Sequence, residues 1–200
     1  MASDLTDSEV ISASLEDPGR FGAIFERHFD RIYAYAARRL GDDKASDVAA
    51  DAFIVAFRRR RDYDLSRHDA LPWLYGITIR IIRHHRVAEF RRLRSLQRPG
   101  EDLPDVTAAD ADGRLDAQLA LPQVAKALNR LSAADRETLL LVAWGDLTYR
   151  DISIAMGVPL GTVRSRLNRA RTRLQTALPH LALDPTATVV RTRTEEGNRG

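Results

Sequence analysis

The sequence TYRDISIAMGVPLGTVRSRLNRAR, residues 148–171, has the pattern of two short helices joined by a glycine turn. Thr148 and Asp151 have the spacing of a capping box, in which two side chains satisfy backbone N–H groups at the start of a helix. Gly157 favours the left-handed backbone that ends a helix, and Pro159 prepares the start of the next one. This layout is typical of a helix-turn-helix, whose second helix enters the major groove of DNA.

The second helix of this segment has an apolar side and a basic side. Apolar residues recur at spacings of three and four, which predicts a buried stripe of Val163, Leu167, Ala170 and Leu174. No acidic residue lies between Leu160 and Arg173 to neutralise the arginines of the other side. Such a surface can bond to phosphates and to base edges, so we favour DNA binding over a merely solvated amphipathic helix. The residues expected to contact DNA are Tyr149, Thr162, Arg164, Ser165, Arg166, Asn168 and Arg169.

Three stretches in the first half of the chain also have helical periodicity. The first runs from Phe21 to Leu40 and stops at Gly41. The second runs from Lys44 to Arg60, and the third from about Leu71 to Leu96. We therefore expect an all-α fold, with two small helical domains joined by a flexible linker and the helix-turn-helix in the C-terminal domain.

Charge divides the chain into blocks. Residues 76–98 contain seven arginines and one acid, whereas residues 101–116 contain six acids and one arginine. Blocks of opposite sign indicate separate partner surfaces. The acidic block follows a Pro99–Gly100 step and lacks helical periodicity, which is typical of a linker. The expected organisation is a domain at 1–98, a linker at 99–114, a second domain at 115–178 and a tail at 179–200.

The third helical stretch mixes arginines with apolar residues on one side. Arg80, Arg83 and Arg86 fall beside Tyr75, with isoleucines between them. Apolar groups among arginines suit a face on which another molecule docks. The same pattern suits packing against an unseen helix or against the other domain. The sequence leaves both alternatives open.

Composition argues against enzymatic chemistry. The chain has no cysteine, which removes disulfides, thiolate metal sites and cysteine nucleophiles. His84 and His85 are adjacent, so on a helix they diverge and cannot chelate one metal as an i, i+4 pair would. The sequence has no phosphate-binding glycine loop and no nucleophile motif. We expect no catalytic activity, no cofactor and no metal.

The sequence also carries no pattern for membrane insertion or export. No apolar run approaches the roughly 18 residues of a membrane span, and the acidic start lacks the basic and apolar regions of a signal peptide. We expect a cytoplasmic protein without membrane insertion.

The C-terminal half resembles a known family of DNA-binding domains. Residues from Gly161 to Arg171 match the Gly-Thr-Val-Arg-Ser-Arg-Leu-x-Arg-Ala-Arg run in the recognition helix of extracytoplasmic-function (ECF) sigma factors of the bacterial sigma-70 family. The stretch from Leu128 to Leu141 is similar to the Leu-x-x-Leu-(Ser/Pro)-x-x-x-Arg-(Glu)-x-x-Leu-Leu-Leu segment of the same domain. The resemblance implies that the seven residues expected to contact DNA read the upstream, minus 35, promoter element.

The N-terminal half resembles the domain of these sigma factors that binds core RNA polymerase and melts the minus 10 element. Residues 46–53 resemble the family's (Ala/Ser)-x-Asp-Leu-Val-Gln-(Glu/Asp)-x-Phe helix, and residues 72–77 resemble its Trp-Leu-x-x-Ile signature. Ala50 stands where glutamine is usual, and Arg80 where asparagine is common. The resemblance implies polymerase contacts at Asp47, Ala50, Asp51 and Phe53, and minus 10 contacts at Tyr63, Tyr75, Arg80, Arg83 and Arg86.

The likeness covers roughly Phe21 to Leu178. It implies an alternative sigma factor that binds core RNA polymerase and directs promoter-specific initiation, is a monomer when free, and has an anti-sigma factor as partner. The competing interpretation is a stand-alone helix-turn-helix repressor or activator. That protein would form a stable dimer on a palindromic operator without polymerase.

Overall fold

The computed structural model describes residues 5–95 and 122–179. In these two ranges the regular elements are all helical, as the sequence predicts. None of the described helices is both long enough and apolar enough to span a membrane. The α-helices are α1 (Asp7–Ala13), α2 (Gly22–Leu40), α3 (Asp42–Arg58), α4 (Leu71–Ser95), α6 (Pro122–Asn129), α7 (Ala133–Trp144), α8 (Tyr149–Met156) and α9 (Leu160–Ala177); two short 3-10 helices, η1 (Pro18–Phe21) and η2 (Arg60–Asp62), precede α2 and follow α3.

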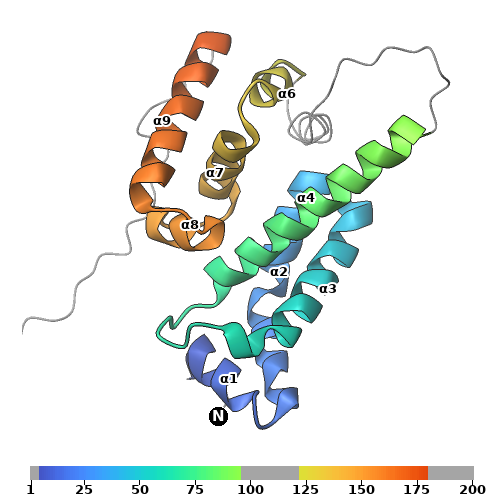
Figure 1. Cartoon of the computed structure of the whole chain (residues 1–200), viewed down its shortest axis with the longest axis vertical. Coiled ribbons are helices and arrows are strands. Elements are labelled where there is room, and N and C mark those ends of the chain that lie inside the picture. The colour runs from blue at the N-terminus through green and yellow to red at the C-terminus, as the bar shows by residue number, and fades with distance from the viewer. Residues whose placement is uncertain (1–4, 96–121, 180–200) are drawn as a thin grey trace, which may run out of the picture.

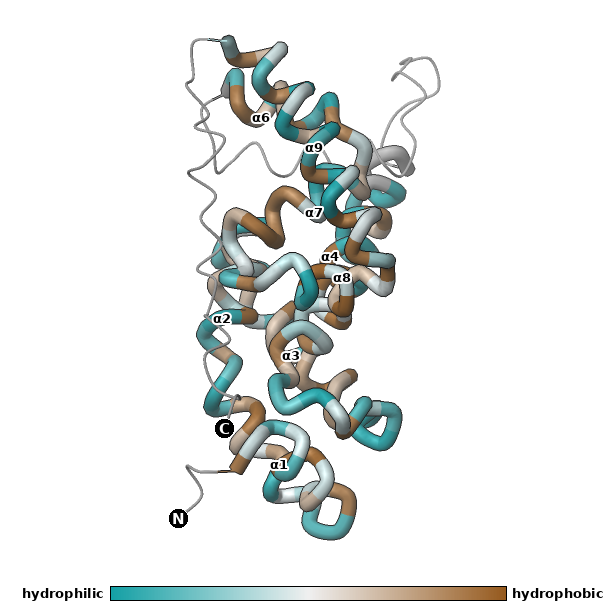
Figure 2. The backbone as a smooth tube through the Cα atoms, turned by 90° about the vertical axis from the view of Figure 1, so that its left-hand side faces the viewer, coloured by the Kyte–Doolittle hydropathy of each residue, from teal (hydrophilic) through white to brown (hydrophobic). Residues whose placement is uncertain are grey.

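Helices α2, α3 and α4 form the body of the N-terminal half (Figure 1). The predicted end at Gly41 is confirmed, because this glycine has a φ of 84° and separates α2 from α3. The second helix begins at Asp42, two residues earlier than expected, because two aspartates in its first turn complement the positive end of the helix dipole. The buried apolar residues of these helices belong to one core, and hydrophobic and hydrophilic positions alternate along each helix (Figure 2).

The first helix, α1, was not predicted from the sequence. It begins with a capping box between Thr6 and Glu9 and is held down by the buried Asp7. Asp7 accepts hydrogen bonds from Arg27 Nη1 at 3.0 Å and from the backbone N–H of Ala70 at 2.9 Å, and its other contact is His28 Nε2 at 2.6 Å. One carboxylate therefore ties α1 to α2 and to the segment before α4.

The helix-turn-helix is confirmed in detail. Thr148 and Asp151 form the predicted capping box, and Gly157 has the left-handed conformation, with a φ of 63°. Pro159 is the N-cap residue of α9. The four residues of the predicted stripe are all buried: Val163, Leu167, Ala170 and Leu174.

The two halves of the chain pack against each other. Helix α8 lies against α4, and one contiguous apolar core includes Leu74 of α4, Leu141 of α7 and Ile152 of α8 (Figure 1). A second, smaller core joins α6 to α9. The predicted boundary at 98, the linker at 99–114 and nearly all of the predicted tail lie outside the described residues.

Candidate nucleic-acid interface

The residues expected to read the minus 35 element lie on the outer surface of the helix-turn-helix. Four of them are exposed on α9: Arg164, Ser165, Asn168 and Arg169. Thr162 and Arg166 are half-buried on the same helix. Tyr149 is half-buried on α8, where its hydroxyl oxygen accepts a hydrogen bond from Arg171 Nη2 at 3.2 Å. The fold thus presents a mixed polar and basic surface opposite the buried stripe, as base and phosphate contacts require.

Arg169 is paired with an acid on the neighbouring helix α7. Its Nη2 donates to Asp135 Oδ1 at 2.9 Å and its Nε to Asp135 Oδ2 at 3.4 Å. The Asp135 side chain is 3% exposed, whereas that of Arg169 is 52% exposed. The hydrogen bond that Arg169 donates to Asp135 raises the pKa of Arg169, so the guanidinium is held as a cation.

A second basic surface follows α4. A shallow groove there is lined by Arg80, Arg83, His84 and Arg91 together with Val87 and Ala88. Arg80 and Arg83 are exposed, as expected for residues that contact DNA. Positive charge along a groove with apolar walls suits a single strand, whose phosphates track the charge while bases contact the apolar surface.

Three residues of the expected minus 10 set are buried in this structure, so their contact with DNA stays a prediction. Tyr63 packs on Trp73 and donates its hydroxyl proton to the carbonyl of Arg67. Tyr75 is 1% exposed, with its ring edge-on to Tyr35 at 5.1 Å. The periodicity of α4 placed Tyr75 on the arginine side, but that side meets the other half of the chain at this end of the helix.

Arg86 is the third of these buried residues. Its side chain is 1% exposed, and its Nη2 donates to the backbone carbonyl of Arg39 at 2.7 Å. This guanidinium joins α4 to the end of α2, whose last carbonyls have no partner within the helix. In this structure Arg86 therefore stabilises the packing of α4 against α2 in the N-terminal half.

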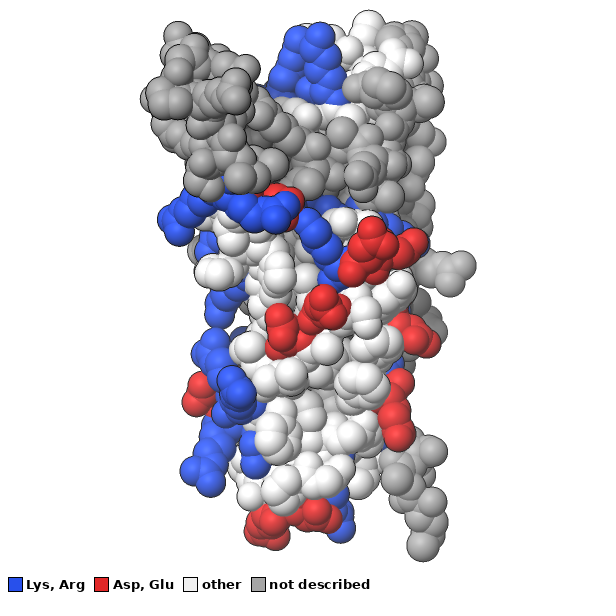
Figure 3. All heavy atoms as spheres, turned by 90° about the vertical axis from the view of Figure 1, so that its right-hand side faces the viewer, with Lys and Arg blue, Asp and Glu red and all other residues white. Residues whose placement is uncertain are grey.

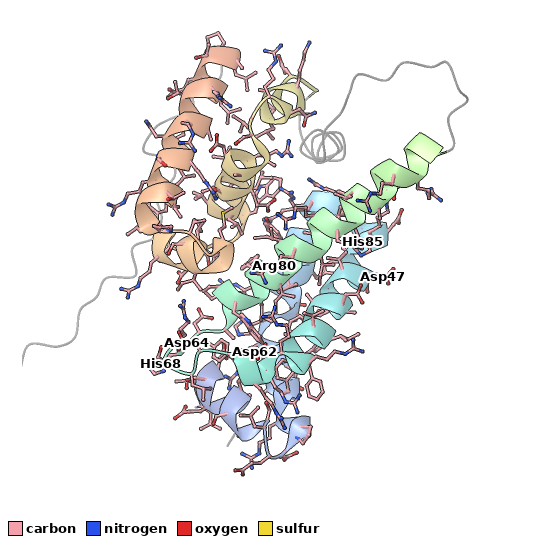
Figure 4. All side chains as sticks on the ribbon, in the orientation of Figure 1. Asp47, Asp62, Asp64, His68, Arg80 and His85 are labelled. Carbon is pink, nitrogen blue, oxygen red and sulfur yellow. The ribbon has the colours of Figure 1, made fainter. Side chains whose placement is uncertain are left out.

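The expected polymerase-binding surface lies on α3. Asp47, Ala50 and Asp51 are exposed, and Asp47 points away from the molecule (Figure 4). Phe53 departs from the expectation: it is 5% exposed because its ring packs on Phe25, with the centroids 5.0 Å apart.

The structure adds a residue to this surface that the sequence did not single out. Ile54 is 48% exposed and lines a groove between α3 and α4 with Asp51 and His85. Asp51 Oδ2 lies 3.9 Å from His85 Nε2. On this side of the molecule acidic side chains lie among residues without charge, with basic side chains along one edge (Figure 3). The signal in the sequence was an isoleucine one position away from the buried stripe of α3.

One cluster has the residue types of a metal site. Asp7, His28 and Asp69 bring their ligand atoms within 4.8 Å of one another. Asp7 already bonds to Arg27, to His28 and to a backbone amide, and the Arg27 cation opposes a second positive charge there. These residues are better explained as the clasp that holds α1.

Comparisons with known proteins decide the family. The sigma-70 region 2 profile matches residues 24–107, and the sigma-70 region 4 profile matches residues 121–174. The RNA polymerase sigma factor NccH of Alcaligenes xylosoxydans xylosoxydans is 31% identical over 172 residues, which are 83% of this chain and 90% of that protein. The chain is an ECF sigma factor of the sigma-70 family. As such it is an alternative sigma factor that directs transcription initiation, and the stand-alone repressor or activator is not favoured.

Solved structures of sigma factors have a similar fold. The sigma factor RpoE of Bartonella quintana, in complex with the anti-sigma factor NepR, matches with a TM-score of 0.55 and 26% identity, over 80% of this sigma factor and 96% of that chain. CnrH in complex with the cytosolic domain of CnrY matches with a TM-score of 0.59 and 22% identity, over 87% and 97% of the two chains. The all-helical fold of this sigma factor is therefore that of its family.

Proposed function

We propose that this sigma factor reads the minus 35 element with α9 and engages the minus 10 element with α4. The observation that carries the proposal is the outer surface of α9, where polar side chains and arginines cluster opposite a fully buried apolar stripe. A helix of this kind, preceded by a capped helix and a left-handed glycine, reads base edges in the major groove.

The groove along α4 suits the second element. Opening duplex DNA costs stacking energy, which is offset when unstacked bases are captured and the strand is tracked by positive charge. Arg80 (Figure 4) and Arg83 are exposed and supply positive charge on this surface. The proposed contact to core RNA polymerase is the exposed face of α3, with Asp47, Ala50 and Asp51 and the apolar Ile54.

The proposed partners are core RNA polymerase, promoter DNA and an anti-sigma factor. The anti-sigma partner is supported by the structural neighbours, since RpoE was solved with the anti-sigma factor NepR. The sigma factor supplies recognition rather than catalytic groups, and needs no cofactor or metal. It acts in the cytoplasm, where polymerase and chromosome are found, and is a monomer until it binds polymerase.

Promoter selection tests this proposal. The chain is mixed with purified core polymerase, and the complex selects from duplex DNA with two randomised blocks in the place of the two elements. We expect co-elution with the polymerase and enrichment of one sequence in each block. A dimer that selects a palindrome equally well without polymerase would support the repressor or activator instead.

A further inference from the structure

The pairing of Arg169 with Asp135 leaves one edge of the guanidinium for DNA. A guanidinium has two edges that each offer parallel N–H donors, one made by Nε and one Nη and the other by both Nη atoms. Asp135 occupies the Nε–Nη2 edge. The edge made by the two Nη atoms remains, and its parallel donors match the O6 and N7 acceptors of guanine.

Asp135 itself is fixed in place. It lies in the first turn of α7, where its backbone N–H donates to the N-cap residue Ser132 at 3.1 Å. A buried carboxylate is costly without a cation, so the pair resists separation. Among the described residues, the other exposed arginines of α9, Arg164 and Arg173, are in no ion pair. Arg169 thus differs from these two exposed arginines because a buried carboxylate holds its guanidinium in place.

We propose that Asp135 is a positioning residue, which fixes Arg169 for the recognition of a guanine in the upstream element. The proposal rests on the proposed function, because it names how one residue of that surface gains its specificity. An arginine that is oriented before binding loses less side-chain freedom on the DNA, and its two free donors are aimed together. An unsupported arginine at the same place would contact phosphates or bases indifferently.

A double-mutant cycle tests the positioning role. The holoenzyme of the wild type, of Asp135→Asn, of Arg169→Ala and of the double variant is assayed on the selected promoter and on its single-base substitutions. We expect Asp135→Asn to lower the discrimination at one G·C pair by about 3- to 30-fold. Arg169→Ala should affect the same pair, and Asp135→Asn should add nothing further in that background. Combined with Arg164→Ala as the matched control, Asp135→Asn should act additively.

Two results would overturn the inference. One is a uniform gain in affinity for all sequences in Asp135→Asn, which would mean that the carboxylate only repels DNA or restrains Arg169 from it. The other is additivity with Arg169→Ala. Asp135→Glu, which can keep the ion pair, should restore part of the discrimination, and a merely structural role would not produce this rescue at one base pair. If the wild-type holoenzyme selects no promoter, the proposed function fails first, so the two failures are distinguishable.

A different observation concerns the contact between the two halves. Glu137 of α7 accepts hydrogen bonds from the Tyr35 hydroxyl and from Arg39 Nη2, the latter at 3.0 Å, and all three side chains are buried. Burial and the nearby Glu137 charge raise the pKa of Tyr35, so its hydroxyl remains a donor. At the edge, Arg31 Nη2 lies 2.6 Å from Asp146 Oδ2. These contacts form a polar latch between α2 and the C-terminal half.

The latch adjoins a close approach of α4 to α8. A Cβ atom placed on Gly76 would lie 2.7 Å from the carbonyl oxygen of Ala155, so only glycine allows the two helices to come this near. The neighbouring Tyr75 is packed on Tyr35 and is buried. Promoter elements roughly two helical turns apart are separated by about 70 Å, whereas here the two DNA-reading halves touch.

We infer that the contacts of Glu137 and the close approach at Gly76 hold the free chain in this closed arrangement, which it must leave before both halves can engage a promoter. The inference rests on the proposed function. Opening breaks the contacts of Glu137 and separates Gly76 from Ala155. It also uncovers the side of α4 next to Tyr75.

A chemical lock tests the closed state, and the absence of native cysteine makes it specific. Arg31→Cys/Asp146→Cys is either bridged with a short bis-maleimide or capped at both thiols with N-ethylmaleimide. On the promoter selected by the wild-type holoenzyme, run-off from the bridged form should fall by about tenfold or more relative to the capped form. Equal run-off from the two forms would overturn the inference.

A second variant tests opening from the other direction. Gly76→Ala keeps α4 helical but clashes with α8, so the free chain should have a larger radius of gyration in small-angle X-ray scattering. Gly22→Ala is the matched control, because a Cβ there meets no atom within 4 Å. An unchanged radius of gyration in Gly76→Ala would show that the close contact does not hold the halves together.

Discussion

Asp7 is a buried carboxylate, and the hydrogen-bond donors around it stabilise its negative charge. Burial alone would raise the pKa of Asp7, but the hydrogen bonds from His28 and from the amide of Ala70 lower it from 3.8 to about 2. Because the folded state binds a proton less readily than the unfolded chain, this stabilisation is complete above about pH 4 and is lost as the pH falls towards 2.

The pH dependence of stability should therefore depend on Asp7. Between about pH 5 and pH 2, the free energy of unfolding of the wild type should fall by roughly 1 to 2 kcal/mol more than that of Asp7→Asn. Urea titrations across this range measure the difference. Parallel pH profiles of the two proteins would mean that Asp7 does not hold α1 through its charge.

At the scale of the helices, the capping box of α8 carries a measurable part of the stability. Thr148 Oγ1 accepts from the backbone N–H of Asp151 at 3.1 Å, and Asp151 Oδ2 accepts from that of Thr148 at 3.0 Å. Thr148→Ala should lower the free energy of unfolding by about 1 kcal/mol. Thr176→Ala, at an exposed position of α9, should change it by less than about 0.5 kcal/mol. Equal effects in thermal or urea unfolding would contradict the cap.

Sequence periodicity predicted the long helices, but it did not predict helix α1. The stripe of α9 and the stop at Gly41 could be predicted because each depends on residues a few positions apart. Helix α1 has only seven residues, which is too short to be stable alone, and it depends on partners from residues 27, 28 and 70. The signal that could have found it was the Thr6–Glu9 capping box.

At the scale of the whole molecule, the contact between the two halves could not be predicted from sequence patterns. Glu137 lies 102 residues from Tyr35 and 98 from Arg39, and no periodicity relates them. The alternative that the basic side of α4 packs against the other domain is confirmed near Tyr75, while Arg80 and Arg83 stay exposed. The exposed positions of α9 could be predicted from its periodicity, whereas the arginine side of α4 is exposed at one end and packed at the other.

Removal of the shared acceptor in the latch should destabilise the closed molecule. Glu137→Ala leaves the buried Tyr35 and Arg39 without this carboxylate, so the free energy of unfolding should fall by about 3 kcal/mol. Arg31→Ala removes the exposed ion pair with Asp146 and should cost less than about 1 kcal/mol. Urea unfolding at neutral pH measures both variants, and equal losses would mean that the buried pair contributes no more than the exposed one.

The most direct test of the central claim is run-off transcription with purified core RNA polymerase and the selected promoter. We expect transcripts only when the chain is present, and a strong loss with Arg169→Ala or with substitution of the upstream element. No transcript, together with no co-purification of the chain and the polymerase, would contradict the proposed function.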